Sequence, residues 1–114
     1  MDWHGRYEAS RMTADEAMQL VRSGDRVFCS GNAATPEPLL RALASRDDLW
    51  DVELVHLLLM GGALDSVGHE GHLRHNALFV GPADRVAVNT GQADYTPAHL
   101  SEIPMLFTSG AMPL

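Results

Sequence analysis

The feature that most constrains this chain is a strand, helix, strand pattern between residues 26 and 60. Residues 26–30 form a short β-branched and aromatic run between Asp25 and Gly31, which predicts a strand buried on both faces. The run 52–60 is mostly apolar, too continuously so for a half-exposed strand, and predicts a second buried strand. Because a full helix connects them, the strands should be parallel with a right-handed crossover. The pattern therefore predicts an α/β fold, an open and mostly parallel sheet with flanking helices.

Two amphipathic helices accompany these strands. Thr13 and Glu16 have the spacing of a capping box, and Gly24 is expected to end the helix that follows. The second helix is expected to have Thr35 as its N-cap and Pro36 at its first position. Its apolar stripe consists of Leu39, Leu40, Leu43 and Ala44.

The remainder has weaker patterns. Residues 61–75 are rich in Gly and His and predict a loop, and residues 77–80 predict a third strand. The segment 84–89 fits either a helix or a strand, because its apolar residues satisfy both periods. A short helix is expected to start near residue 101 and to end at Gly110.

Composition excludes several classes of protein. The net charge is −7, with 8 Arg and no Lys, which disfavours nucleic-acid binding through a basic face. Cys29 is the only cysteine, the N-terminus lacks the pattern of a signal peptide, and no apolar run approaches the ~20 residues that span a bilayer. These features predict a cytoplasmic protein that does not associate with membranes.

A loop follows the first strand and precedes the second helix. Backbone N–H groups at such a place suit an anion or an oxyanion, although an ordinary strand-to-helix turn explains the same residues. The residues of this candidate oxyanion loop are Gly31, Asn32, Ala33, Ala34, Thr35 and Pro36.

Histidine and cysteine residues raise two other possibilities. The spacing of His69, His72 and His75 resembles that of zinc ligands. On a helix, however, the third imidazole would be rotated by a further ~60° from the first two, and Gly residues interrupt the segment. No metal site is therefore predicted. Cys29 within an apolar strand is expected to be a small buried side chain rather than a nucleophile. His56 is expected to lie in the core or at a strand end.

The densest polar cluster outside the expected helices lies between residues 91 and 102. Asp94, Tyr95, His99, Ser101 and Glu102 belong to it. Loops with several such groups often form sites, but a turn in which Asp94 and Ser101 act as caps fits equally well.

Taken in order, several segments resemble the N-terminal domain of the acetyl-CoA hydrolase/transferase family, which includes 4-hydroxybutyrate CoA-transferases. The segments are 23–27, 31–40, 52–56, 75–81 and 89–97 with 100–104. The resemblance implies a CoA-transferase-like fold, of which residues 13–114 would form the N-terminal part after an extension of residues 1–12. It also implies that the chain is the opening part of a longer protein.

The resemblance implies an enzyme that transfers coenzyme A between a short-chain acyl-CoA and a carboxylate, or that hydrolyses acetyl-CoA. The CoA thioester would be a substrate, with no permanently bound cofactor. In the family, the nucleophile is a glutamate in a second half, so this chain alone is expected to be inactive. The candidate oxyanion loop would receive the thioester oxygen. The residues expected near the cleft between the two halves of the fold are His75, Asn76, Asp94, Tyr95, Pro97 and Ser101.

One departure and one alternative accompany this resemblance. The family commonly has Gly-Arg-Ala-Asp-Tyr where this chain has Gln92, and a neutral Gln lacks the charged fork of Arg. The alternative function is a non-catalytic binding or assembly module that pairs with a separately encoded catalytic half. In either case we expect the chain to self-associate as a homo-oligomer through exposed strand edges.

Overall fold

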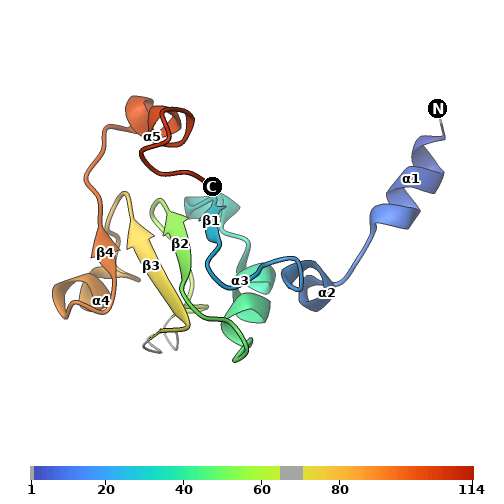
Figure 1. The fold of residues 1–114 in the computed structure, drawn as a ribbon, viewed down its shortest axis with the longest axis horizontal. Helices are drawn as coiled ribbons and strands as arrows, with labels where there is room; N and C mark the ends of the chain where they lie inside the picture. Colours follow the sequence, from blue (N-terminus) through green and yellow to red (C-terminus); the bar gives the residue numbers. More distant parts are fainter. Residues whose placement is uncertain (1, 65–70) are drawn as a thin grey trace.

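Four parallel strands form the centre of the molecule (Figure 1). The computed structural model describes residues 2–64 and 71–114. The strands lie in the order β1 (Arg26–Cys29), β2 (Val52–His56), β3 (Leu73–Ala77) and β4 (Asp94–Tyr95). Each neighbouring pair is parallel. The predicted α/β fold with an open parallel sheet is confirmed.

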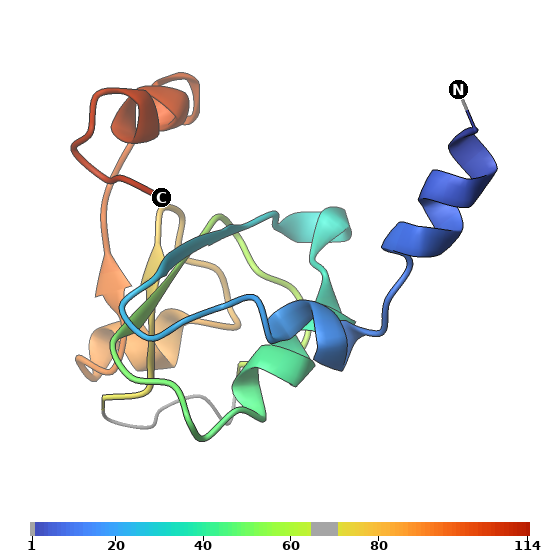
Figure 2. The ribbon, with the colours of Figure 1, turned by 45° about the vertical axis from the view of Figure 1, so that its right-hand side comes forward.

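One face of the sheet is covered by two helices, α2 (Ala14–Met18) and α3 (Glu37–Ala44). Figure 2 shows these helices side by side, whereas α1 (Trp3–Ser10) stands away from the sheet with every residue exposed. The capping box at Thr13 is present, because its hydroxyl accepts from the Glu16 N–H and the Glu16 carboxylate accepts from the Thr13 N–H. None of the described helices is long and apolar enough to cross a membrane.

The second half of the chain adds α4 (Arg85–Asn89) before β4, and then a 3₁₀ turn (Leu100–Glu102) that leads into α5 (Ile103–Thr108). In Figure 1, α5 lies beyond the carboxyl ends of the strands. The ambiguous segment 84–89 is thus a helix over most of its length. The expected loop around residue 94 contains the short strand β4.

Within residues 2–64 and 71–114, the core forms two clusters on the two faces of the sheet. The larger cluster joins the strands to α2 and α3, and its fully buried members include Leu40, Leu43, Val52 and Leu54. The smaller cluster lies on the opposite face and contains Val55, Leu78, Ile103 and Met112.

Two expected strand boundaries are wrong. The strand expected over 52–60 ends at His56, and Leu58 has a left-handed backbone with φ 49°, outside the region that strands adopt. The strand expected over 77–80 lies earlier, at β3. Its buried His75 and Asn76 are polar, so a search for an apolar run could not find it.

Two smaller expectations also fail. The strand expected to be buried on both faces, β1, buries only Cys29 fully, and Phe28 remains 41% exposed. The helix expected to run from Thr13 to Gly24 ends at Met18, and Gly24 instead takes a left-handed turn with φ 84° before β1.

Candidate functional site

A cleft of about 440 Å³ opens at the carboxyl edge of the sheet. The loop after β1 forms one wall, the segments after β2 and β3 form the floor, and the segment after β4 forms the other wall. The lining residues are Gly31, Asn32, Leu57, Leu58, Phe79, Ala98, His99 and Leu100. In open parallel sheets, ligands bind at this edge.

The first wall is held against the end of β2 by a close backbone approach. A Cβ atom on Gly31 would overlap the carbonyl oxygen of Leu57, so only glycine fits at this position. The next residue, Asn32, has φ 51°, and its N–H donates to the carbonyl oxygen of Leu58 over 2.7 Å. The candidate oxyanion loop is therefore fastened to the floor of the cleft.

This bond removes the Asn32 N–H from the donors that the loop was expected to offer to an anion. The Asn32 N–H already has a partner, whereas the N–H groups of Gly31 and Ala33 have none within the described parts of the chain. Residues Asn32–Ala34 form a 3₁₀ turn in which Ala33 and Ala34 are exposed. Among the described residues, the loop thus has two N–H groups without a backbone partner, one on the exposed Ala33 and one on Gly31 at the lining of the cleft.

Thr35 and Pro36 differ from their expected roles. Thr35 is not the N-cap of α3, since Pro36 occupies that position and makes no side-chain cap. The Thr35 hydroxyl instead donates to the carbonyl oxygen of Asn32 over 2.7 Å and accepts from the Met60 N–H over 3.2 Å. Because one hydroxyl can do both, Thr35 joins the loop to the segment after β2.

The opposite wall follows β4, which pairs with β3 through only two residues. The Thr96 N–H extends this pairing by donating to the carbonyl oxygen of Ala77 over 3.0 Å. Among the sequence candidates here, Tyr95, Pro97 and Ser101 are exposed and border this wall without lining the cleft.

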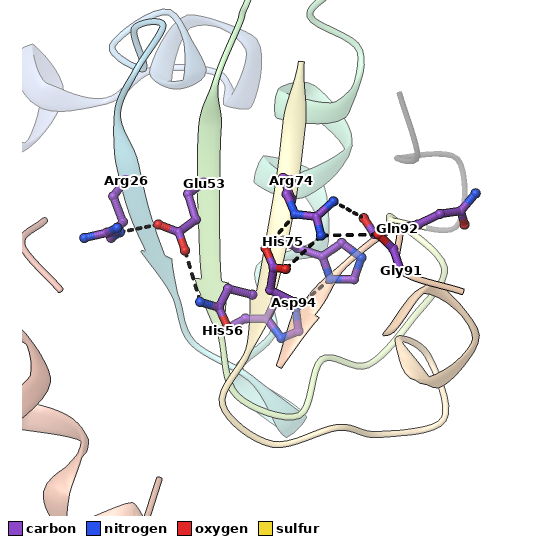
Figure 3. Close-up of polar contacts among 9 residues, drawn as sticks. Arg26, Glu53, His56, Arg74, His75, Gly91, Gln92 and Asp94 are labelled. Atoms are coloured by element: carbon purple, nitrogen blue, oxygen red, sulfur yellow. Dashed lines mark hydrogen bonds and ion pairs between the residues drawn. The ribbon is translucent and has the colours of Figure 1, made fainter. Parts of the chain in front are cut away.

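Asp94 lies on the sheet rather than in the cleft. Its carboxylate accepts two hydrogen bonds from the Arg74 guanidinium, over 2.5 and 2.7 Å, and this partner holds the pKa of Asp94 below its usual range. Arg74 also reaches the carbonyl oxygens of Gly91 and Gln92 (Figure 3). Gln92 carries no charge, and Asp94 receives its cationic partner from Arg74 on the neighbouring strand β3.

His75 also lies outside the cleft, in the core beside α3. Its Nδ1 lies 2.9 Å from Nε2 of His56, and both rings are buried, with exposures of 3% and 0%. Burial lowers both pKa values, that of His56 to about 4, so both imidazoles are neutral at neutral pH. One of the two facing nitrogens donates to the other, so a hydrogen bond joins the rings. The expectation that His56 lies in the core or at a strand end is confirmed.

Asn76 points to the other face of the sheet. Its amide donates to the Glu53 carboxylate over 3.0 Å, and Glu53 in turn pairs with Arg26 of β1 (Figure 3). A row of polar side chains therefore crosses all four strands on this face. We call this row the polar belt; it consists of Arg26, Glu53, Arg74, Asn76 and Asp94.

The remaining chemical candidates are separated. His69 lies outside the described residues, His72 stacks on Trp50 at 4.2 Å between ring centroids, and His75 pairs with His56. Among residues 2–64 and 71–114, no three metal-ligating side chains gather. Cys29 is buried, and its burial raises the pKa of the thiol to about 11, so it stays protonated and unreactive at neutral pH.

The sequence analysis missed most of the apolar floor of the cleft. Leu57 and Leu58 directly follow β2, and Phe79 is the second residue after β3, so a correct prediction of where those strands end would have identified them. Arg74 was also missed, because no local signal shows which residue of a neighbouring strand a side chain will face.

Comparisons with known proteins agree on the kind of protein. The model of the acetyl-CoA hydrolase/transferase N-terminal domain matches residues 1–114. The 4-hydroxybutyrate coenzyme A transferase of Clostridium kluyveri is 38% identical over 116 residues, covering 100% of this chain and 27% of that protein. A succinyl-CoA:acetate/propanoyl-CoA:succinate CoA transferase of Fasciola hepatica is 39% identical over 106 residues, covering 90% of this chain and 22% of that protein.

A solved structure gives the same fold. RipA from Yersinia pestis superposes with a TM-score of 0.83 at 24% identity, covering 96% of this chain and 28% of that chain. The chain thus spans about a quarter of the length of the curated relatives it matches. From the family match over residues 1–114, we conclude that this chain belongs to the acetyl-CoA hydrolase/transferase family, whose N-terminal domain it matches.

Proposed function

We propose that this chain supplies one wall of the active site of a CoA-transferase. The catalysed reaction would move coenzyme A from an acyl-CoA to a carboxylate, R–CO–S–CoA + R′–COO⁻ → R–COO⁻ + R′–CO–S–CoA. The observation that carries the proposal is the cleft at the carboxyl edge of the sheet, with a loop at its rim that offers two unpartnered N–H groups. Membership in the family supports the reaction class.

The proposed reaction uses a glutamate nucleophile outside residues 1–114. Its carboxylate attacks the thioester carbonyl, and CoA leaves as the thiolate, which forms an acyl-glutamyl anhydride. The thiolate then attacks the glutamyl carbonyl, which releases R–COO⁻ and leaves a glutamyl-CoA thioester. The acceptor carboxylate repeats these two steps in reverse order and regenerates the glutamate. A hydrolase would differ only in that water takes the place of the acceptor.

The role proposed for this chain is to stabilise the negative oxygen that develops at the attacked thioester carbonyl. Preorganised N–H donors at such an oxygen contribute ~10²–10³ in rate each. The Gly31 and Ala33 N–H groups are the donors, because the Asn32 N–H is bonded to Leu58. The loop is well suited to this role because Gly31, Asn32 and Thr35 hold it rigidly against the segment after β2.

Two relatives suggest the range of substrates. One is named for 4-hydroxybutyrate, and the other for succinyl-CoA, acetate, propanoyl-CoA and succinate. We propose that this chain's substrates are likewise a short-chain acyl-CoA and a small carboxylate.

Thioester exchange between acetyl-CoA and a short-chain carboxylate tests the proposal. The longest translated product that contains residues 1–114 is assayed alone and together with the product of the neighbouring reading frame. Transfer in either preparation supports a CoA-transferase. Binding of a partner without transfer in any preparation would instead support the alternative function, a non-catalytic assembly module.

Gly31→Ala is the variant that tests the loop. The new methyl group displaces the loop from Leu57, so we expect kcat to fall by about a hundredfold or more, as on loss of an oxyanion donor. Gly24→Ala is the matched control. It has φ 84° with open space around it, so it costs about 1 kcal/mol of stability but should leave transfer unchanged. Equal losses in the two variants would refute the role of the loop.

A further inference from the structure

The side chains that line the cleft are mainly hydrocarbon. Leu57, Leu58, Phe79, Ala98 and Leu100 are the lining residues with apolar side chains, and Phe79 and Leu100 remain 56% and 72% exposed. The polar groups are confined to the Gly31 backbone, Asn32 and His99. The cleft thus has an apolar floor beside the two unpartnered N–H groups of the loop.

Among the described residues, no arginine lines the cleft, and the chain has no lysine. The nearby strands carry two guanidinium groups on the polar belt, and both have partners. Arg26 is bonded to Glu53 and to the Pro113 carbonyl oxygen, and Arg74 is bonded to Asp94 and to two backbone carbonyls. A carboxylate placed on the apolar floor would therefore lose its hydration without gaining an Arg or Lys partner from the described residues of this chain.

The backbone of the floor supports a rigid pocket. Leu58 is held at φ 49° by two hydrogen bonds, in which its N–H donates to Phe79 and its carbonyl oxygen accepts from Asn32. A Cβ atom on Gly81 would lie 2.8 Å from Cδ1 of Leu58, so the leucine side chain is also confined from that side. A bulky residue kept in a strained conformation is typical of a functional position.

We infer that this cleft binds the hydrocarbon part of the acyl group and selects an uncharged acyl chain over one that ends in a carboxylate. The inference rests on the proposed function and specifies the class of acyl group that the enzyme uses. The thioester carbonyl lies at the loop, and the acyl chain extends over Leu57, Leu58 and Phe79. A terminal methyl group is accepted there, whereas a terminal carboxylate is rejected because the described lining offers it neither Arg nor Lys.

Butyryl-CoA and succinyl-CoA provide a matched pair of substrates, since both have four-carbon acyl groups and differ in a terminal methyl group or carboxylate. With acetate as the acceptor, the active preparation that contains residues 1–114 should use butyryl-CoA with a kcat/KM at least tenfold higher. A ratio below tenfold overturns the inference while leaving the CoA-transferase proposal intact. No transfer from any CoA ester overturns both.

Two variants locate the selectivity in the cleft. Phe79→Arg and Leu100→Arg each place a cation on its lining and should lower the butyryl to succinyl ratio by tenfold or more. Both side chains are largely exposed, so folding should be preserved, which thermal unfolding checks. Val86→Arg on α4 is the control, because Val86 is 71% exposed and lies outside the cleft; its ratio should not change.

Equal losses with both substrates in Phe79→Arg and Leu100→Arg would mean that another part of the protein covers the cleft, and would overturn the inference. A butyryl to succinyl ratio in Phe79→Arg and Leu100→Arg equal to that of Val86→Arg would also overturn the inference.

Discussion

Both faces of the sheet carry polar side chains from β2 and β3, but these side chains are stabilised in opposite ways on the two faces. On the face covered by α3, His56 and His75 are buried, neutral and bonded to each other. On the other face, the polar belt keeps its charges in ion pairs whose side chains are 27–51% exposed. The difference follows from the cost of burying a charge, which is large in the core and small where water can still reach.

This difference predicts which contacts the fold depends on. In the buried pair, removal of one ring leaves the other without its partner and without water. In the polar belt, a group that loses its partner can still be hydrated. We therefore expect changes on the covered face to be more destabilising than chemically similar changes on the belt.

His75→Leu should have the largest effect. It leaves His56 buried with neither ring nitrogen bonded, because Nδ1 already has no partner among the described residues. We expect the free energy of unfolding to fall by about 2–3 kcal/mol, measured by urea denaturation at pH 7. The double variant H56L/H75L is the control and should recover most of the loss, since it removes both polar groups. No recovery would show that packing, rather than the orphaned imidazole, causes the effect.

The same pair predicts a dependence of stability on pH. The folded pKa of His56 is about 4, below the value of 6.5 expected when unfolded, so between these values the unfolded state binds the extra proton. Stability should therefore be complete above pH 6.5 and fall by on the order of 3 kcal/mol as the pH drops toward 4.

Thermal melts at intervals from pH 7 to pH 4 measure this dependence. Burial raises the pKa of Asp84, which acts in the opposite direction because the folded state then takes up that proton more readily. The double variant H56L/H75L should show a shallower decline with falling pH. An unchanged decline would assign the effect to other groups.

Glu53→Gln should have an intermediate effect. It removes the charge that Arg26 faces but keeps an oxygen that the Asn76 amide can donate to. Since both charged side chains are less than a third exposed, we expect a loss of about 1 kcal/mol in urea denaturation. A loss as large as that of His75→Leu would contradict the contrast between the two faces.

Asp94→Asn should have the smallest effect on stability. The Arg74 and Asp94 side chains are 51% and 47% exposed, so water replaces much of what the pair provides. We expect a loss of no more than about 0.5 kcal/mol, and a smaller one in high salt. A loss above 1 kcal/mol that salt does not reduce would show that Arg74 secures the short strand β4 through more than charge.

The sequence predicted the fold class because that depends on local patterns. The apolar runs, the capping box at Thr13 and the helix between two strands each appear within a few residues. The candidate oxyanion loop was located for the same reason, and its first two residues line the cleft. His75 and Asn76 were selected as chemically important, but their sequence positions did not show which face of the sheet each would take.

The sequence by itself therefore determined the α/β fold class, the parallel pairing of the first two strands and the position of the candidate oxyanion loop. Only the tertiary structure decided where β2 and β3 end, that His75 faces His56, that Arg74 reaches Asp94, and that Leu58, Phe79 and Leu100 share one cleft. The physical reason is that helix and strand preferences act over a few residues. Register and burial instead depend on partners that lie far away along the chain, as in the contacts of Arg74 and His75, which span 17 to 20 residues.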